Sequence, residues 1–123
     1  MSRTGVIGLL FTVAALVFSS GAGAAEENWK YFGADQKGSR YFYDASTVMH
    51  LSSDLIQVWT RELTSEGPAK KLKEINCPFK VIRDLQIIYE GKQKPRVRPH
   101  TPSGWRPMEQ DPVTQELHKV LCR

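Results

Sequence analysis

Hydrophobic and polar residues alternate along several short stretches of the chain, and this pattern predicts β-strands with one face turned toward a core. The expected strands, in chain order, are 28–32, 40–43, 48–51, 55–63, 71–77 and 81–90. The polar segment 33–38 has glycine at both ends and indicates a hairpin between the first two strands. The segment 64–71 contains Gly67-Pro68 and indicates a loop.

In two of these strands, the positions of the apolar residues predict which side chains lie on the same face of the sheet. In 55–63, Trp59 lies on one face and Val58 on the other, so this strand is expected to be central and covered on both sides. In 81–90, simple alternation places Leu85 and Ile87 together on one face.

The residues from Asp111 onward follow a helical period. Asp111 suits the N-cap position and Pro112 the first helical position, because proline lacks an N–H that would have no partner there. One apolar stripe follows, made of Val113, Leu117, Val120 and Leu121. A helix of about 12 residues is marginal in isolation, so we expect this one to pack on the sheet.

Short strands followed by one helix predict an α+β domain, most simply an antiparallel sheet with the C-terminal helix on one face. The residues expected in its core are Trp29, Tyr41, Val58, Trp59, Leu85, Ile87, Leu117 and Val120.

The N-terminal residues show the three parts of a secretory signal peptide. Arg3 supplies a positive start, 5–18 is an apolar core, and 22–24 is a small-residue cleavage site. We expect residues 1–24 to be removed and residues 25–123 to form one domain, with no transmembrane segment after cleavage. A retained N-terminal anchor is the alternative.

The charge of the processed chain is only mildly basic. Of the 17 lysines and arginines one lies in the expected signal peptide, which leaves 16 against 13 acidic residues and a net charge of +3. This excess does not indicate nucleic acid as a partner, and export argues against it.

The chain has two cysteines, Cys77 and Cys122. A disulfide between them would tie the helix to the sheet and stabilise the fold by about 4 kcal/mol on the loop-entropy model. The alternatives are two free thiols, or a zinc site with His100 and His118. Export favours the disulfide, and a two-cysteine zinc site would have tighter ligand spacing. We expect no metal and no other cofactor.

Motifs that follow one another along the mature chain are Trp29-Lys30-Tyr31, Tyr41-Phe42-Tyr43-Asp44 with Ser46 and Thr47, Val58-Trp59-Thr60, Cys77, Trp105, Asp111-Pro112-Val113, Leu117 and Val120-Leu121-Cys122. In order and spacing they resemble the surface-adhesin protein E family of bacterial exported proteins. The resemblance implies a six-stranded antiparallel sheet and a C-terminal helix held by the disulfide. It also implies a place at or near the outer surface of a Gram-negative cell, and binding of host matrix and serum proteins.

The resemblance supplies no ligand site, because no binding loop of the family's adhesin matches this chain residue by residue. The chain also has no cysteine before Cys77, and so lacks the family's lipid-anchor cysteine. We therefore expect either the periplasm or the cell surface as its location.

A segment without acidic residues carries a basic side chain at every second position, namely Lys92, Lys94, Arg96, Arg98 and His100. On an extended backbone these side chains share one face, and Trp105 and Arg106 follow closely enough to extend it. Such a row suits the phosphate, sulfate or carboxylate groups of a polyanion. The alternative is a strand edge that lysine and proline protect against aggregation.

The remaining signals argue against catalysis. The chain contains no Gly-x-Ser-x-Gly, no His-Glu-x-x-His and no glycine-rich phosphate loop. Trp29 and Trp59 are expected in the core, and Trp105 is expected to be exposed. We therefore expect a small exported binding module that is not an enzyme, adhesin-like, with a protein or polyanionic ligand still to be identified. The alternative is a periplasmic structural or stress-related accessory protein without an exposed ligand site, and the oligomeric state stays open.

Overall fold

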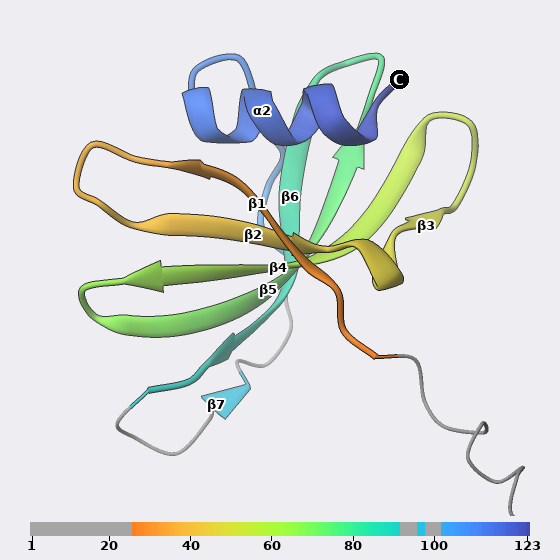
Figure 1. The fold of residues 1–123 in the computed structure, drawn as a ribbon. Coiled ribbons are helices and arrows are strands. Elements are labelled where there is room, and N and C mark those ends of the chain that lie inside the picture. The colour runs from red at the N-terminus through yellow and green to blue at the C-terminus, as the bar shows by residue number, and fades with distance from the viewer. Residues whose placement is uncertain (1–25, 92–95, 98–101) are drawn as a thin grey trace, which may run out of the picture.

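The structure, a computed structural model, describes residues 26–91, 96–97 and 102–123. A twisted antiparallel sheet carries the helix α2 across one end (Figure 1). A short 3-10 helix, η2, joins the second and third strands. The elements are β1 (Trp29–Ala34), β2 (Arg40–Asp44), η2 (Ala45–Thr47), β3 (Met49–His50), β4 (Leu55–Thr64), β5 (Gly67–Asn76), β6 (Val81–Tyr89), β7 (Arg96–Val97), β8 (Arg106–Pro107) and α2 (Pro112–Leu121).

The sheet runs in the order β1–β2–β4–β5–β6–β7, and neighbouring strands are antiparallel. β3 pairs with β4 beyond the end of β2, and β8 pairs with β6 at the end away from β7. Within the described part of the chain, this sheet and its C-terminal helix confirm the predicted α+β class and the expected size of about six main strands.

The predicted hairpin between β1 and β2 is present, and Asp35 organises its turn. The Asp35 carboxylate accepts the backbone N–H groups of Lys37 and Ser39 at 2.9 and 3.0 Å. It also accepts the hydroxyl of Tyr41 at 2.9 Å. Gly38 takes a φ of 89°, a conformation that glycine adopts without a steric penalty.

The prediction of a loop at 64–71 is wrong. β4 and β5 form one long hairpin with only Ser65 and Glu66 between them. The Thr64 hydroxyl accepts the Glu66 N–H and donates to the Gly67 carbonyl, which closes the turn. Gly67 supplies the positive φ of 113°. The usual signal of a two-residue hairpin is Asn-Gly or Asp-Gly inside the turn, and here the glycine comes after it.

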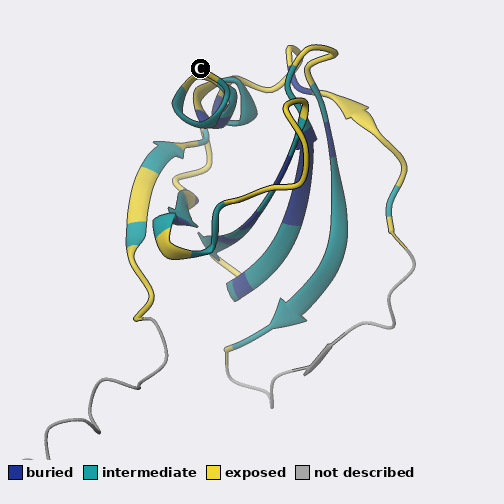
Figure 2. Ribbon diagram, turned by 90° about the vertical axis from the view of Figure 1, so that its right-hand side faces the viewer, coloured by how far each residue is buried: buried dark blue, intermediate teal, exposed yellow. Residues whose placement is uncertain are grey.

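The core lies between α2 and the middle strands, where Figure 2 shows the buried residues gathered. Alternate residues of β4 point into it, because Ile56, Val58 and Thr60 are buried while their neighbours are only partly so. The buried cluster consists of Val58, Ile75, Ile82, Met108 and Leu117.

Of the residues predicted for the core, Val58 and Leu117 are buried. The prediction is wrong for the half-buried remainder, which are Trp29, Tyr41, Trp59, Leu85, Ile87 and Val120. The predicted cover on both sides of β4 is wrong for the same reason, since the Trp59 face is only partly covered.

A bulge in β6 interrupts the alternation on which the prediction for Leu85 and Ile87 rests. Leu72 pairs with Gln86, whereas the next residue, Lys73, pairs with Asp84, so Leu85 is the extra residue. In β6, the residues on the face toward α2 are even-numbered before Leu85, such as Ile82, and odd-numbered after it, such as Ile87. Simple alternation therefore does not hold across this bulge, which lies in the stretch that carries Leu85 and Ile87.

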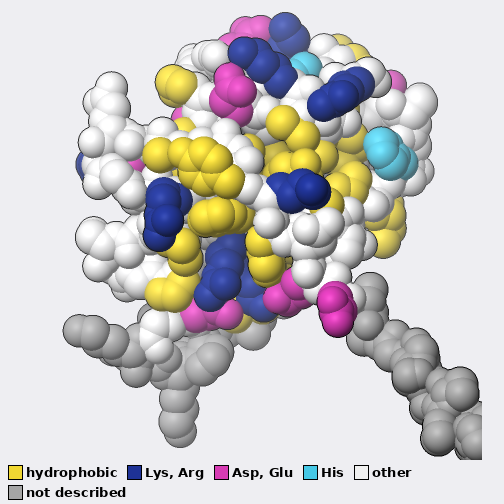
Figure 3. Space-filling view, viewed as in Figure 1, with side chains coloured by type: hydrophobic (Ala, Val, Ile, Leu, Met, Phe, Trp, Pro, Cys, Tyr) yellow, Lys and Arg dark blue, Asp and Glu magenta, His cyan; other side chains and the backbone are white. Residues whose placement is uncertain are grey.

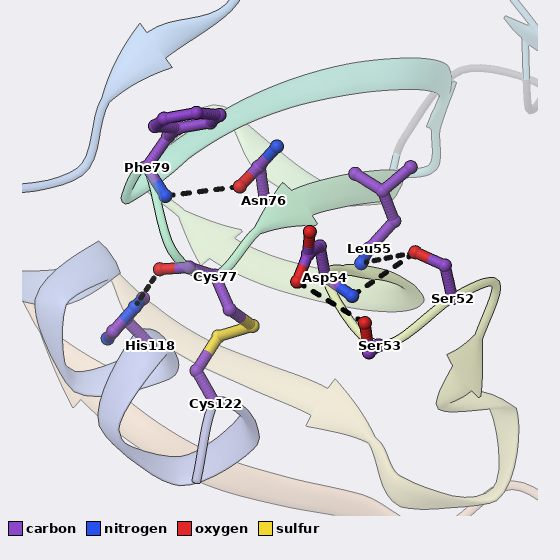
Figure 4. Close-up of a disulfide and its surroundings, with 9 residues drawn as sticks. All are labelled: Ser52, Ser53, Asp54, Leu55, Asn76, Cys77, Phe79, His118 and Cys122. Carbon is purple, nitrogen blue, oxygen red and sulfur yellow. Dashed lines mark hydrogen bonds between the residues drawn. A yellow bond between two sulfur atoms is a disulfide. The ribbon is translucent and has the colours of Figure 1, made fainter.

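The helix is held at both ends. The Asp111 carboxylate accepts the Val113 N–H at 3.0 Å, which confirms the predicted N-cap. Beyond the last helical residue, Cys122 forms a disulfide with Cys77 at the end of β5 (Figure 4). In the last turn, Nε2–H of His118 donates to the Cys77 carbonyl at 3.0 Å.

The disulfide prediction is thus confirmed, and the described cysteines include no free thiol that would serve the zinc alternative. In the described ranges, no helix has the length and apolar character needed to cross a membrane. The predicted signal peptide, residues 1–24, lies outside these ranges.

Candidate functional site

The predicted polyanion-binding row falls mostly outside the described residues, which is the case for Lys92, Lys94, Arg98 and His100. Arg96 belongs to β7, where its backbone pairs with Tyr89 of β6. The contribution of these residues to a polyanion site therefore stays a prediction.

Trp105 and Arg106, the proposed extension of that row, do not share a surface. The Trp105 ring lies 4.5 Å from the Arg83 guanidinium carbon, whereas Arg106 Nη2 lies 3.4 Å from Asp84 Oδ1. Arg83 and Asp84 are successive residues of β6 and point to opposite faces of the sheet. Trp105 is exposed, as predicted.

A cleft of about 470 Å³ lies between α2 and the sheet, and we call it the helix-side cleft. Apolar side chains such as Ile82 and Leu117 line it together with polar ones such as Thr114. Its charged lining residues are Glu62, Lys71, Lys73, Arg106 and Asp111.

The cations of the helix-side cleft have acidic partners within the protein. Lys73 Nζ lies 2.6 Å from Asp84 Oδ1, and Lys71 Nζ lies 3.1 Å from Glu62 Oε2. Burial lowers the pKa of Lys73, and Asp84 opposes this shift. Burial also acts to raise the pKa of Asp84, but Lys73 and Arg106 outweigh it and hold that pKa below its ordinary value. The charges of this cleft are therefore largely neutralised from within.

A second hollow, of about 300 Å³, lies on the other face of the sheet, and we call it the tryptophan hollow. Trp29 comes from β1 and Trp59 from β4, and both are half-buried there rather than buried in the core as predicted. The remaining lining residues are Glu27, Asp44, Ser46, Thr47, Lys70 and Ile88. On the face shown in Figure 3, hydrophobic side chains surround single lysines and arginines, and acidic side chains lie near the start of the described chain.

Asp44 fixes the wall of the tryptophan hollow. The residue is 2% exposed, and its carboxylate accepts the N–H of Asn28 at 2.8 Å. It also accepts the N–H and the hydroxyl of Ser46, at 3.0 and 2.6 Å. Burial acts to raise the pKa of Asp44, but these hydrogen bonds outweigh it and hold that pKa below its ordinary value. The segment that carries Trp29 is thereby joined to the end of β2.

A row of alternating charges begins in the lining of the tryptophan hollow with Glu27 and Lys70 and continues beyond it with Glu90 and Arg61, and we call this row the rim. Lys70 Nζ lies 3.9 Å from Glu27 Oε2 and 3.9 Å from Glu90 Oε2, and Arg61 Nε lies 3.5 Å from Glu90 Oε1. The last contact is an ion pair without a hydrogen bond. The indole N–H of Trp29 donates to Glu27 Oε1 at 3.1 Å, which holds that ring in place.

Several hydroxyl and imidazole groups form hydrogen bonds that stabilise the fold. Ser46 donates to Asp44, Thr47 accepts the backbone N–H of Trp59 at 3.2 Å, and His118 bonds to Cys77. Among the described residues, no group of three or more His, Cys, Asp or Glu side chains could hold a metal ion. The arrangement offers aromatic side chains and fixed hydrogen-bonding groups, which suit binding.

Sequence reasoning missed that Trp29 and Trp59 line one hollow. The available signal was the strand period, which places Trp59 on the face opposite to Ile56 and Val58. Glu27 precedes the first strand and Lys70 fell in the mispredicted loop, so neither was marked.

Comparison of the chain with protein-family models, with curated proteins and with solved structures found no match. The resemblance to the surface-adhesin protein E family therefore stays a prediction from the residues of the chain.

Proposed function

We propose that this chain is a small exported binding module with an adhesin-like role and no catalytic step, and that the tryptophan hollow is its ligand site. The observation that supports this most is the pair of half-buried tryptophans at one open hollow. Large aromatic side chains contribute most to stability when they are fully buried, so two left partly open in a small domain favour a binding role.

The disulfide supports the export part of the proposal. Structural disulfides persist in the periplasm and outside the cell and are rare in the reducing cytosol. The Cys77–Cys122 bridge therefore agrees with the signal peptide expected at residues 1–24.

The tryptophan hollow is a better ligand site than the larger helix-side cleft. A charged ligand in that cleft would compete with Asp84 for Lys73 and with Glu62 for Lys71, which are short ion pairs already in place. Separating such a pair leaves partly buried charges without their partners, which costs free energy. In the tryptophan hollow the contacts of Lys70 are both 3.9 Å long, so its ammonium is held less closely.

A binding array tests the proposal. The purified protein, with its disulfide intact, is applied to three classes of immobilised ligand, which are extracellular matrix proteins, anionic glycans and neutral glycans. We expect retention on at least one class, loss of that retention in Trp29→Ala, and normal retention in the matched control Trp105→Ala. Retention that is absent, or equal in all three proteins, would overturn the proposal.

Protease shaving of intact cells separates the adhesin-like role from the periplasmic alternative. Peptides released from intact cells, identified by mass spectrometry, place the protein outside. Peptides that appear only after the outer membrane is opened favour the structural or stress-related accessory protein, which needs no exposed ligand site.

A further inference from the structure

The tryptophan hollow combines aromatic side chains with a rim of alternating charges, and together they select a class of ligand. We infer that it binds a neutral saccharide, an inference that rests on the proposed binding function. The hollow measures about 300 Å³, at the small end of the range for pockets that hold small molecules. It therefore suits a short unit of a glycan chain.

The two tryptophans supply the apolar part of the site. They come from strands that are not neighbours, since β2 lies between β1 and β4, and Ile88 of β6 lines the same hollow. The indole N–H of Trp29 is occupied by Glu27, which leaves the ring as its contribution to a ligand. A pyranose ring presents a face of C–H groups that packs on such an aromatic surface.

The charges of the rim disfavour ionic ligands of either sign. Lys70 would repel a cation placed between the tryptophans, and Glu27 would repel a polyanion. The rim residues Glu27, Lys70, Glu90 and Arg61 alternate in the sign of their charge. The rim as a whole therefore attracts neither cations nor anions. A ligand without charge avoids both repulsions.

The spacing around Lys70 suits hydroxyl groups. Its Nζ lies 3.9 Å from Glu27 Oε2 and 3.9 Å from Glu90 Oε2, which is beyond hydrogen-bond distance in both cases. A ligand hydroxyl can accept from the ammonium and donate to a carboxylate at the same time, because each O–H carries both capacities. Sugars present several such hydroxyls beside their C–H face, and so match both halves of the hollow.

The test uses the same array, read for neutral oligosaccharides built from hexoses and N-acetylhexosamines. We expect the protein to bind members of this class. Trp29→Ala should weaken that binding about tenfold, because a stacking partner is lost, whereas Trp29→Phe should restore most of it. Trp105→Ala is the matched control and should bind as the unchanged protein does.

A second variant guards against misfolding of the first. Glu27 lies in an exposed lead-in before β1, so Glu27→Ala leaves the strands untouched and should still weaken binding severalfold. Hollow-dependent binding to matrix proteins or anionic glycans alone would overturn the saccharide inference and leave the proposed function standing. Absence of any hollow-dependent binding would overturn both.

Discussion

The ion pair of Lys73 and Asp84 lies beneath the helix, with Lys73 only 7% exposed. Removing one member leaves the other as a buried charge without its partner, which costs more than the pair contributes. We expect Asp84→Ala to lower the free energy of unfolding by about 3 to 5 kcal/mol. Urea denaturation with the disulfide intact measures it.

Two controls separate this penalty from general damage. Replacing both members, as Lys73→Met with Asp84→Leu, removes the buried charges together and should cost much less than Asp84→Ala alone. Lys80→Ala breaks an exposed pair with Glu109 and should change the free energy of unfolding by less than about 1 kcal/mol. A double variant as unstable as Asp84→Ala would contradict the argument.

The lowered pKa of Asp44 predicts how the free energy of unfolding depends on pH. Its folded pKa lies below the ordinary value of 3.8, so its contribution is present above the unfolded-state pKa and is lost as the pH falls through the folded pKa. We expect the free energy of unfolding to stay level down to about pH 5 and to decline below about pH 4. Asp44→Asn should show a shallower decline in the same urea series, and an identical slope in both proteins would exclude this role.

At the scale of elements, the cap of α2 gives a separable contribution. Asp111→Ala removes the acceptor for the Val113 N–H and should lower the free energy of unfolding by about 1 kcal/mol. Asp111→Asn keeps a side-chain acceptor without the charge and should stay close to the original protein. Thermal unfolding of the three proteins measures this, and equal losses in Ala and Asn would point to the charge instead of the cap.

The elements that could be predicted are those with a local cause. Pro112 after Asp111 begins the helix, and the alternation in β4 follows from one covered face. The β4–β5 turn and the β6 bulge have no comparable signal, because pairing with a neighbouring strand decides them. Met108 belongs to the core although it lies in no regular element, since the segment before α2 folds over the sheet.

The candidate site was less predictable than the fold. The hollow depends on the strand order, which brings Trp29 of β1 and Ile88 of β6 to the same space. Local patterns carry no information about that order. The aromatic residues were noticed, but their sequence pattern is the same for a buried core and for an open hollow.

At the scale of the whole molecule, the disulfide joins residues 45 apart in sequence. Replacing both cysteines by serine should lower the free energy of unfolding by about 4 kcal/mol on the loop-entropy model. Hydrogen exchange should show the largest loss of protection in α2, with the β4–β5 hairpin less affected, because the bridge anchors the helix end directly. Uniform loss across the domain would contradict this anchoring role.

The same bridge decides how the fold would carry mechanical load. Tension applied at Arg123 passes through Cys122 into Cys77 and enters the end of β5, so the backbone between the two cysteines bears none of it. With the disulfide intact, a fully stretched chain would be shorter than the reduced chain by the loop between the two cysteines. That loop spans on the order of 150 Å when its backbone is extended. The strands before Cys77 take the strain of pulling, while α2 and the backbone of β6 lie outside the covalent path of the force.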